Sequence, residues 1–74
     1  MSNAAHGTPT WRAVRKVIKR LDEGDGAPRE EVVRRVSNMT GHAEDSVEGV
    51  VEDMERRGEV YRVNGRLKDT NEVL

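Results

Sequence analysis

A mainly α-helical domain with a small β-hairpin is the fold class that the sequence predicts. Three segments carry apolar residues at the 3.6-residue spacing of helices that bury one face. Near the C-terminus, Asn64-Gly65 separates two short strand-like stretches, and this dipeptide is the strongest short signal for a hairpin. The chain of 74 residues suffices for one small domain. We expect a three-helix bundle with a hairpin over residues 8–69, a disordered segment at 1–7 that begins with a cloning remnant, and a frayed tail at 70–74.

The first helix is expected to begin at Thr8-Pro9, where Thr8 caps the helix and Pro9 takes the first helical position. Two glycines in the acidic stretch that follows, Gly24 and Gly26, indicate a turn. Trp11, the only tryptophan, is expected to anchor this helix in the core. The apolar residues fall on one half of the helical wheel: Trp11, Val14, Val17, Ile18 and Leu21.

Pro28 is the start signal of the second helix, and acidic residues in its first turn favour the positive end of the helix dipole. Ser37-Asn38 and Gly41 are expected to end it. Because β-branched residues are mediocre helix formers, packing rather than propensity must hold this helix. Its apolar stripe consists of Val32, Val33, Val36 and Met39.

The third helix is expected to run to about Arg57, with Gly58 directly after its C-terminus. His42, before this helix, is expected to be partly buried and hydrogen-bonded, and not a pH switch. The apolar stripe spans an arc of roughly 100°, the width of a core-facing surface. It comprises Ala43, Val47, Val50, Val51 and Met54.

The hairpin is expected to place its two strands on either side of Asn64-Gly65 in a type I′ turn. Alternation along the strands directs Val60 and Leu67 to one face, which we expect to rest on the helices. The other face then carries Tyr61, Val63, Arg66 and Lys68.

Several functional classes are excluded by composition. Cysteine is absent and only two histidines are present, so we expect neither a metal site nor a cofactor. No nucleophile, base and orienting group can be combined, so we expect no enzyme activity and no small-molecule substrate. No apolar run approaches the ~20 residues of a membrane span, and no signal peptide is visible, so we expect a cytoplasmic protein without a membrane partner.

The charges are segregated although the net charge is only −1. Residues 11–21 hold five bases and no acid, whereas residues 43–55 hold six acids and no base. Bases on the first helix, together with the cations and ring of the hairpin, are the candidate nucleic-acid-binding residues: Arg12, Arg15, Lys16, Lys19, Arg20, Tyr61, Arg62, Arg66 and Lys68. Acids on the outward face of the third helix are candidate contacts for a basic protein: Asp45, Glu48, Glu52 and Glu55. For each group an ordinary solvated surface is the alternative.

The order of elements and the segment 28–69 resemble the winged helix-turn-helix superfamily. Thr40-Gly41 stands at the turn, the apolar stripe of residues 47–54 at the core of the third helix, and Arg57-Gly58-Glu59-Val60 at its exit into the wing. More narrowly, residues 26–33 and 57–61 resemble the C-terminal winged-helix domain of archaeal minichromosome-maintenance helicases and modules linked to archaeal single-strand-binding proteins. The chain departs from the helicase pattern after Tyr61, where Arg62-Val63-Asn64-Gly65 stands in place of a charged, proline-containing wing. The resemblance implies a regulatory or protein-contact role beside a motor.

We therefore expect an accessory domain of archaeal DNA replication that is monomeric in isolation. It would contact DNA through the first helix and wing, and a basic protein through the third helix. In DNA-reading winged helices the third helix enters the groove, and its acidic surface here would be repelled by phosphates. Two alternatives stay open: a small transcription regulator that reads duplex DNA as a dimer, although no spare long helix is visible for the dimer interface, and a winged helix that binds only protein.

Overall fold

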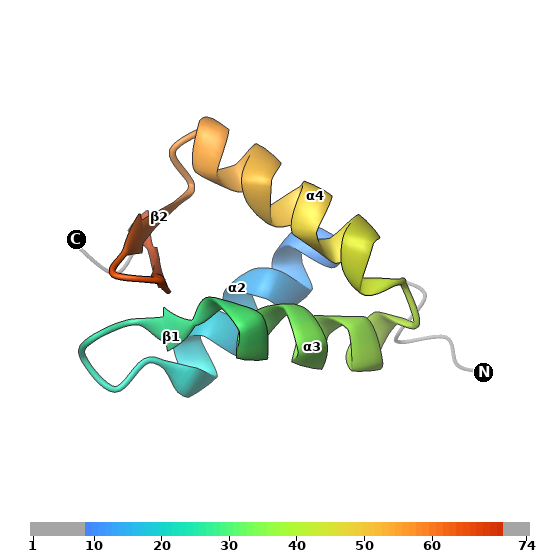
Figure 1. Cartoon of the computed structure of the whole chain (residues 1–74), viewed down its shortest axis with the longest axis horizontal. Helices are drawn as coiled ribbons and strands as arrows, with labels where there is room; N and C mark the ends of the chain where they lie inside the picture. Colours follow the sequence, from blue (N-terminus) through green and yellow to red (C-terminus); the bar gives the residue numbers. More distant parts are fainter. Residues whose placement is uncertain (1–8, 71–74) are drawn as a thin grey trace.

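The computed structural model describes residues 9–70, and in this part of the chain three helices combine with one small antiparallel sheet. In Figure 1, α3 and α4 diverge from a shared turn, α2 lies behind them, and the hairpin stands at the opposite end from that turn. The predicted mainly α fold with a small hairpin is confirmed, and the layout is compatible with a winged helix. The elements are α2 (Thr10–Leu21), β1 (Ala27–Pro28), α3 (Arg29–Thr40), α4 (Glu44–Arg56), β2 (Val60–Val63) and β3 (Arg66–Asp69).

The helix starts differ slightly from the prediction. Pro9 precedes α2 instead of occupying its first position, and its carbonyl accepts hydrogen bonds from the N–H groups of Arg12 and Ala13 at 3.1 Å. Thr8, the predicted cap, lies outside the described residues, as do residues 1–7 and 71–74. Pro28 likewise stands just before α3. Proline suits both sites because it has no N–H to leave unsatisfied.

The ends of α3 and α4 are closed by glycines with positive φ. Gly41 follows α3 with φ 80° and caps it, as expected, whereas Ser37 and Asn38 of the same predicted stop signal remain helical. Gly58 follows α4 with φ 78°. There the N–H of Glu59 donates to the Met54 carbonyl at 2.9 Å and the N–H of Gly58 to the Glu55 carbonyl at 3.1 Å. This pair of bonds is a Schellman motif, which satisfies carbonyls that the helix leaves unpaired.

The sheet has the strand order β1-β3-β2, with antiparallel pairing on both sides of β3. Asn64 and Gly65 have φ of 52° and 77°, which confirms the predicted type I′ turn between β2 and β3. The strand β1, in which Ala27 pairs with Leu67, was not predicted. Through β1, the turn that follows α2 becomes part of the sheet.

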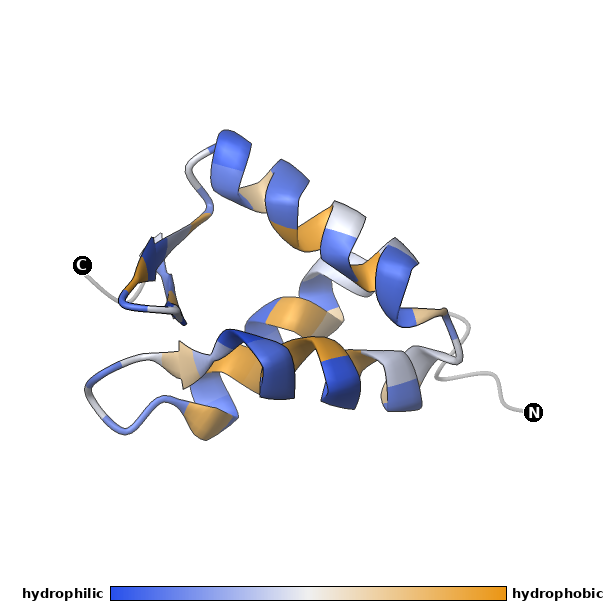
Figure 2. Ribbon diagram, viewed as in Figure 1, coloured by the Kyte–Doolittle hydropathy of each residue, from blue (hydrophilic) through white to orange (hydrophobic). Residues whose placement is uncertain are grey.

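The core lies where the three helices and β3 meet, and Figure 2 shows the apolar parts of the helices turned toward this centre. Val60 and Leu67 are buried, as expected for the hairpin face that rests on the helices. Leu21 and Val50 are partly buried against the core. The buried apolar residues are Ala13, Val14, Val17, Ile18, Ala27, Val32, Val33, Val36, Val47, Val51, Met54, Val60 and Leu67.

Four predictions of burial are wrong. Trp11 is 42% exposed and Met39 is 47% exposed, and Ala43 and His42 are also exposed. Ala13 takes part in the core of α2 instead, which turns Trp11 to about 90° from the centre of the buried stripe at 100° per residue. Met39 lies in the last turn of α3, where its side chain stays at the surface. His42 lies in the surface turn, where its backbone rather than its ring is bonded.

Thr70, the first residue of the segment expected to be frayed, is hydrogen-bonded to the rest of the domain. The hydroxyl of Thr70 donates to the Gly58 carbonyl at 2.7 Å, and its N–H donates to the Glu59 carbonyl at 3.0 Å. These bonds fasten the end of β3 to the exit of α4.

Candidate functional site

The five bases of α2 divide into two groups in the folded domain. Arg15 turns inward, with a side chain 25% exposed and its Nε 3.7 Å from a carboxylate oxygen of the buried Asp69. Arg12 lies over the ring of Trp11, 5.4 Å from the centroid, in a cation–π arrangement. The other three bases are exposed and form no ion pair with any described residue: Lys16, Lys19 and Arg20.

Folding brings two further arginines, from α3, beside the exposed bases of α2. Lys16 and Arg20 line an open groove of about 630 Å³ together with Arg34 and Arg35, and its apolar wall includes Met39. We call this surface the basic groove, and count Lys19, on the same helix, as its neighbour. Arg34 and Arg35 were not among the predicted residues, because they belong to a different helix whose charges are mixed.

One acid accompanies these cations. Glu31 pairs with both arginines: Nε of Arg35 lies 2.9 Å from its Oε2, and Arg34 contacts its Oε1. The hydrogen bond from Arg35 lowers the pKa of Glu31, and the charges of both arginines add to this effect. A single carboxylate thus holds the two guanidinium groups in place, and the groove keeps an excess of positive charge.

The cations of the hairpin are all engaged within the molecule. Arg62 forms two hydrogen bonds with the Glu55 carboxylate, at 3.0 and 3.2 Å, and this contact raises the pKa of Arg62. Arg66 donates to the Gly26 carbonyl at 3.0 Å. Tyr61 is 36% exposed. The hairpin therefore offers fewer free cations than its sequence indicates.

Lys68 and Asp22 join the hairpin to the turn after α2. Lys68 Nζ lies 3.3 Å from Asp22 Oδ2 and 2.9 Å from the Gly24 carbonyl. Asp22 Oδ1 accepts hydrogen bonds from the N–H groups of Gly24 and Gly26 at 2.7 and 2.9 Å. These two backbone bonds, and then Lys68, lower the pKa of Asp22. This contact is a structural brace that ties Lys68 into the fold.

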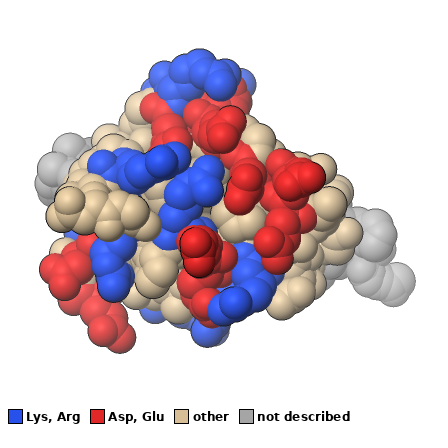
Figure 3. Space-filling model, in the orientation of Figure 1, with Lys and Arg blue, Asp and Glu red and all other residues tan. Residues whose placement is uncertain are grey.

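The acids of α4 are partly neutralised. Glu48 lies 3.7 Å from Arg29, and Glu55 binds Arg62. Asp45 and Glu52 are exposed and form no ion pair with any described residue. Figure 3 shows acidic side chains gathered over α4 on the face in view. The helix that would enter DNA in a winged helix thus presents negative charge to solvent.

Two kinds of site are not found among residues 9–70. No group of three or more His, Cys, Asp or Glu residues in this range could hold a metal ion. None of the helices described is long and apolar enough to cross a membrane. The charged residues that line the basic groove are four cations and the carboxylate of Glu31, with the amide of Asn38 beside them.

Comparison with known proteins leaves the chain without a match: no family model, no curated protein and no solved structure corresponds to it.

Proposed function

We propose that this protein is a nucleic-acid-contacting accessory module that binds phosphates through the basic groove and Lys19. The observation that carries the proposal is the meeting of Lys16 and Arg20 with Arg34 and Arg35 across α2 and α3, with one carboxylate among them. Lys and Arg that neutralise phosphates release counterions, and this release drives nucleic-acid binding at moderate salt. The role is one of binding and not of catalysis.

The charge of α4 supports the choice of this surface. Asp45 and Glu52 have no ion-pair partner among residues 9–70, so a duplex placed along α4 would bring phosphates against two free carboxylates. Docking through α2 and α3 avoids this repulsion. The proposal therefore keeps the first helix of the expected interface and replaces most of the hairpin with α3.

Membership of the winged-helix superfamily and a place in archaeal replication belong to the same proposal. The order of helices and strands supports the first, and the residues quoted at 26–33 and 57–61 support the second. A phosphate-binding groove suits an accessory domain that steers or retains a strand beside a motor.

The test is a titration of fluorescein-labelled single-stranded and duplex oligonucleotides with the domain. Binding is measured by fluorescence anisotropy at several salt concentrations. Five cations at the surface predict a salt slope of up to about −3.5 for a single strand, at −0.7 per phosphate neutralised. Reversing two charges (Lys16→Glu with Arg20→Glu) should flatten this slope by about 1.4 and weaken binding at low salt. The same reversal at Arg34 and Arg35 should act alike.

The matched control reverses Arg56 and Arg57, which are exposed at the C-terminus of α4 and away from the basic groove. This variant has the same net charge as the Lys16 and Arg20 variant, and its salt slope should equal that of the parent protein. If both variants lost oligonucleotide affinity equally, the effect would be one of net charge alone, and the proposal of a specific binding surface would be contradicted. Amide shifts on titration that centre on residues 44–52 would place the interface on α4 and contradict the proposal.

A further inference from the structure

The residues that α3 contributes to the basic groove form one row along the helix. Four of them stand at the i, i+3, i+4 and i+7 spacing that places helical side chains on one face, and the fifth follows directly. They are Glu31, Arg34, Arg35, Asn38 and Met39. The row begins with charged groups and ends with an amide and a thioether. The groove therefore passes from a charged part to an uncharged part within about one helical turn, or about 5.4 Å.

Glu31 holds the guanidinium group of Arg35 in a defined position. Its Oε2 accepts a hydrogen bond from Arg35 Nε at 2.9 Å, and the Arg35 side chain is still 49% exposed. Arg34 contacts the other oxygen of the same carboxylate. A planar guanidinium that is fixed and open to solvent is a surface on which an unpaired base can stack.

Met39 lies one turn after Arg35 and extends this surface, because side chains at i and i+4 are neighbours on a helix. The Met39 side chain is exposed and lines the groove. A thioether offers little to a phosphate, whereas methionine sulfur makes favourable contacts with aromatic rings such as those of nucleobases. Asn38, beside it, carries both a donor and an acceptor that can bond to the edge of a base.

The opposite wall of the groove, from α2, supplies charge for the phosphates. Lys16 and Arg20 stand one turn apart, are exposed, and form no ion pair with any residue from 9 to 70. Free cations of this kind neutralise phosphates and release counterions. The two walls thus suit the two parts of a nucleotide, its base and its phosphate.

A duplex cannot use both walls. Its bases are stacked and paired, so that sugars, phosphates and base edges reach the outside while the base faces do not. A single strand can turn an unstacked base away from its neighbours. Phosphate contacts alone favour the duplex, since each contributes a salt slope of about −0.9 there and about −0.7 on a single strand. A preference for the single strand would therefore have to come from its bases.

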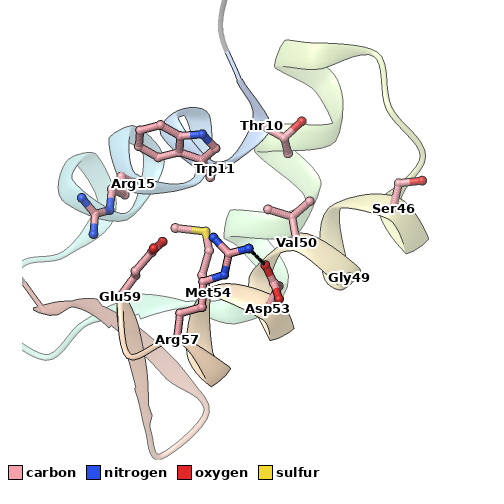
Figure 4. A pocket seen from close by; sticks show the side chains of 10 residues that line it. All are labelled: Thr10, Trp11, Arg15, Ser46, Gly49, Val50, Asp53, Met54, Arg57 and Glu59. Carbon is pink, nitrogen blue, oxygen red and sulfur yellow. Dashed lines mark ion pairs between the residues drawn. The ribbon is translucent and has the colours of Figure 1, made fainter.

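A second groove, of about 920 Å³ between α4 and the N-terminal part of α2, lacks this combination. Its apolar residues include Trp11 and Met54, but its charged residues are two bases and two acids: Arg15, Arg57, Asp53 and Glu59. Figure 4 shows Arg57 paired with Asp53, and their closest atoms lie 3.1 Å apart. This groove has no excess of positive charge for the phosphates of a strand.

We propose that the basic groove takes a single-stranded nucleic acid and discriminates against a duplex. One unpaired base stacks on Arg35 and Met39, its edge bonds to Asn38, and the flanking phosphates lie against Lys16 and Arg20. The inference rests on the proposed function and adds the class of nucleic acid and the part of it that is recognised. Because every base has an aromatic face, we expect little sequence preference.

The test compares four fluorescein-labelled probes of about 16 nucleotides by anisotropy, at about 0.15 M salt. They are a DNA strand, an RNA strand of the same sequence, the corresponding DNA duplex, and a DNA strand in which every site is abasic. The two intact strands distinguish DNA from RNA as the source, and the abasic strand keeps the phosphates without the bases. We expect at least one intact strand to bind about tenfold tighter than both the duplex and the abasic strand.

Two variants of the protein test the stacking surface without changing its charge. Met39→Ala should weaken binding of the preferred strand about threefold to tenfold and leave the abasic strand unaffected. Arg35→Lys should act in the same direction, because lysine keeps the charge and loses the plane. The matched controls are Val63→Ala on the exposed side of the hairpin and Arg57→Lys after α4, which should both bind as the parent does.

Three results would overturn the inference. In the first, the duplex or the abasic strand binds as tightly as the intact strands. In the second, Met39→Ala and Arg35→Lys, both folded by circular dichroism, keep the affinity of the parent for the strand. In the third, an oligoglutamate peptide of equal formal charge displaces the strand as well as unlabelled strand does, which would identify a general site for acidic chains.

Failure of the proposed function has a different signature. The combined change Lys16→Glu and Arg20→Glu would then leave the binding of every probe unchanged, and both proposals would be overturned. If this change weakens all probes while intact strands, duplex and abasic strand bind the parent equally, the proposed function stands and the inference about single strands fails.

Discussion

Replacing Gly26 by alanine should cost this domain most of its stability. Gly26 is buried with φ 95°, and an added Cβ would lie 3.1 Å from each of three atoms: Arg66 Cβ, the Leu67 carbonyl oxygen and Lys68 Cγ. A side chain at positive φ costs about 1–2 kcal/mol. Overpacking of a tight site adds about 1–3 kcal/mol, and two of the three neighbours here cannot swing away because they are a backbone oxygen and a Cβ. The sum is roughly 2–5 kcal/mol, against a total of about 3–5 kcal/mol expected for a domain of this size.

The assay is urea unfolding followed by circular dichroism at the helix band, compared with Gly41→Ala. Gly41 has a similar φ of 80°, but a Cβ there meets nothing within 4 Å, so this control carries the backbone strain without the clash. Gly26→Ala should be less stable than Gly41→Ala by at least about 1 kcal/mol, which is the lower limit of the overpacking cost. Equal stabilities of the two variants would refute the close contact between this turn and β3.

Two further predictions concern the helix glycine and the brace. Gly49→Ala should stabilise the domain by about 1 kcal/mol, because an exposed helix interior prefers alanine, and should raise Tm by roughly 4–8 °C in a thermal melt; a lower Tm would show that Gly49 is needed by the fold. The pKa of Asp22 is lowered below its ordinary 3.8 by the N–H groups of Gly24 and Gly26 and then by Lys68, so the unfolded chain takes up this proton first as the pH falls. The stabilisation by Asp22 is therefore complete above its unfolded pKa and is lost as the pH falls through the folded value. Asp22→Asn should flatten the decline of Tm as the pH falls below about 5, and an unchanged decline would assign acid sensitivity to other groups.

The three helices and the hairpin could be predicted because each rests on local signals. Val32, Val33 and Val36 repeat at helical spacing, and Asn64-Gly65 imposes its turn through backbone angles alone. The strand β1 could not be predicted, since two residues have no periodicity and their pairing partner lies 40 positions away at Leu67. The burial of Trp11 was predicted wrongly because the hydrophobic pattern shows which half of a helix is apolar. It does not show which part of that half packs against another element.

The candidate site could be predicted only in part from the sequence, for the same reason. Lys16, Lys19 and Arg20 are exposed, as could be expected because a run of bases without acids has no local partner. Arg34 and Arg35 were missed, since only the packing of α3 on α2 brings them to the same groove. The engagement of Arg62 with Glu55 could not be foreseen either, because the pair joins a helix to a strand through a turn of the chain.

The position of β3 at the centre of the sheet has a consequence for how this protein folds during synthesis. Among residues 9–70, β3 is the last strand, and it holds β1 and β2 on either side, packs against α2 and is joined to Asp22 through Lys68. A chain emerging from the ribosome therefore cannot close this core in stages, since β3 is synthesised after every other described element and yet joins them. We expect the helices to stay unsettled during synthesis and the whole domain to assemble in one step once Asp69 is free, so that premature termination yields an unfolded fragment and not a smaller domain.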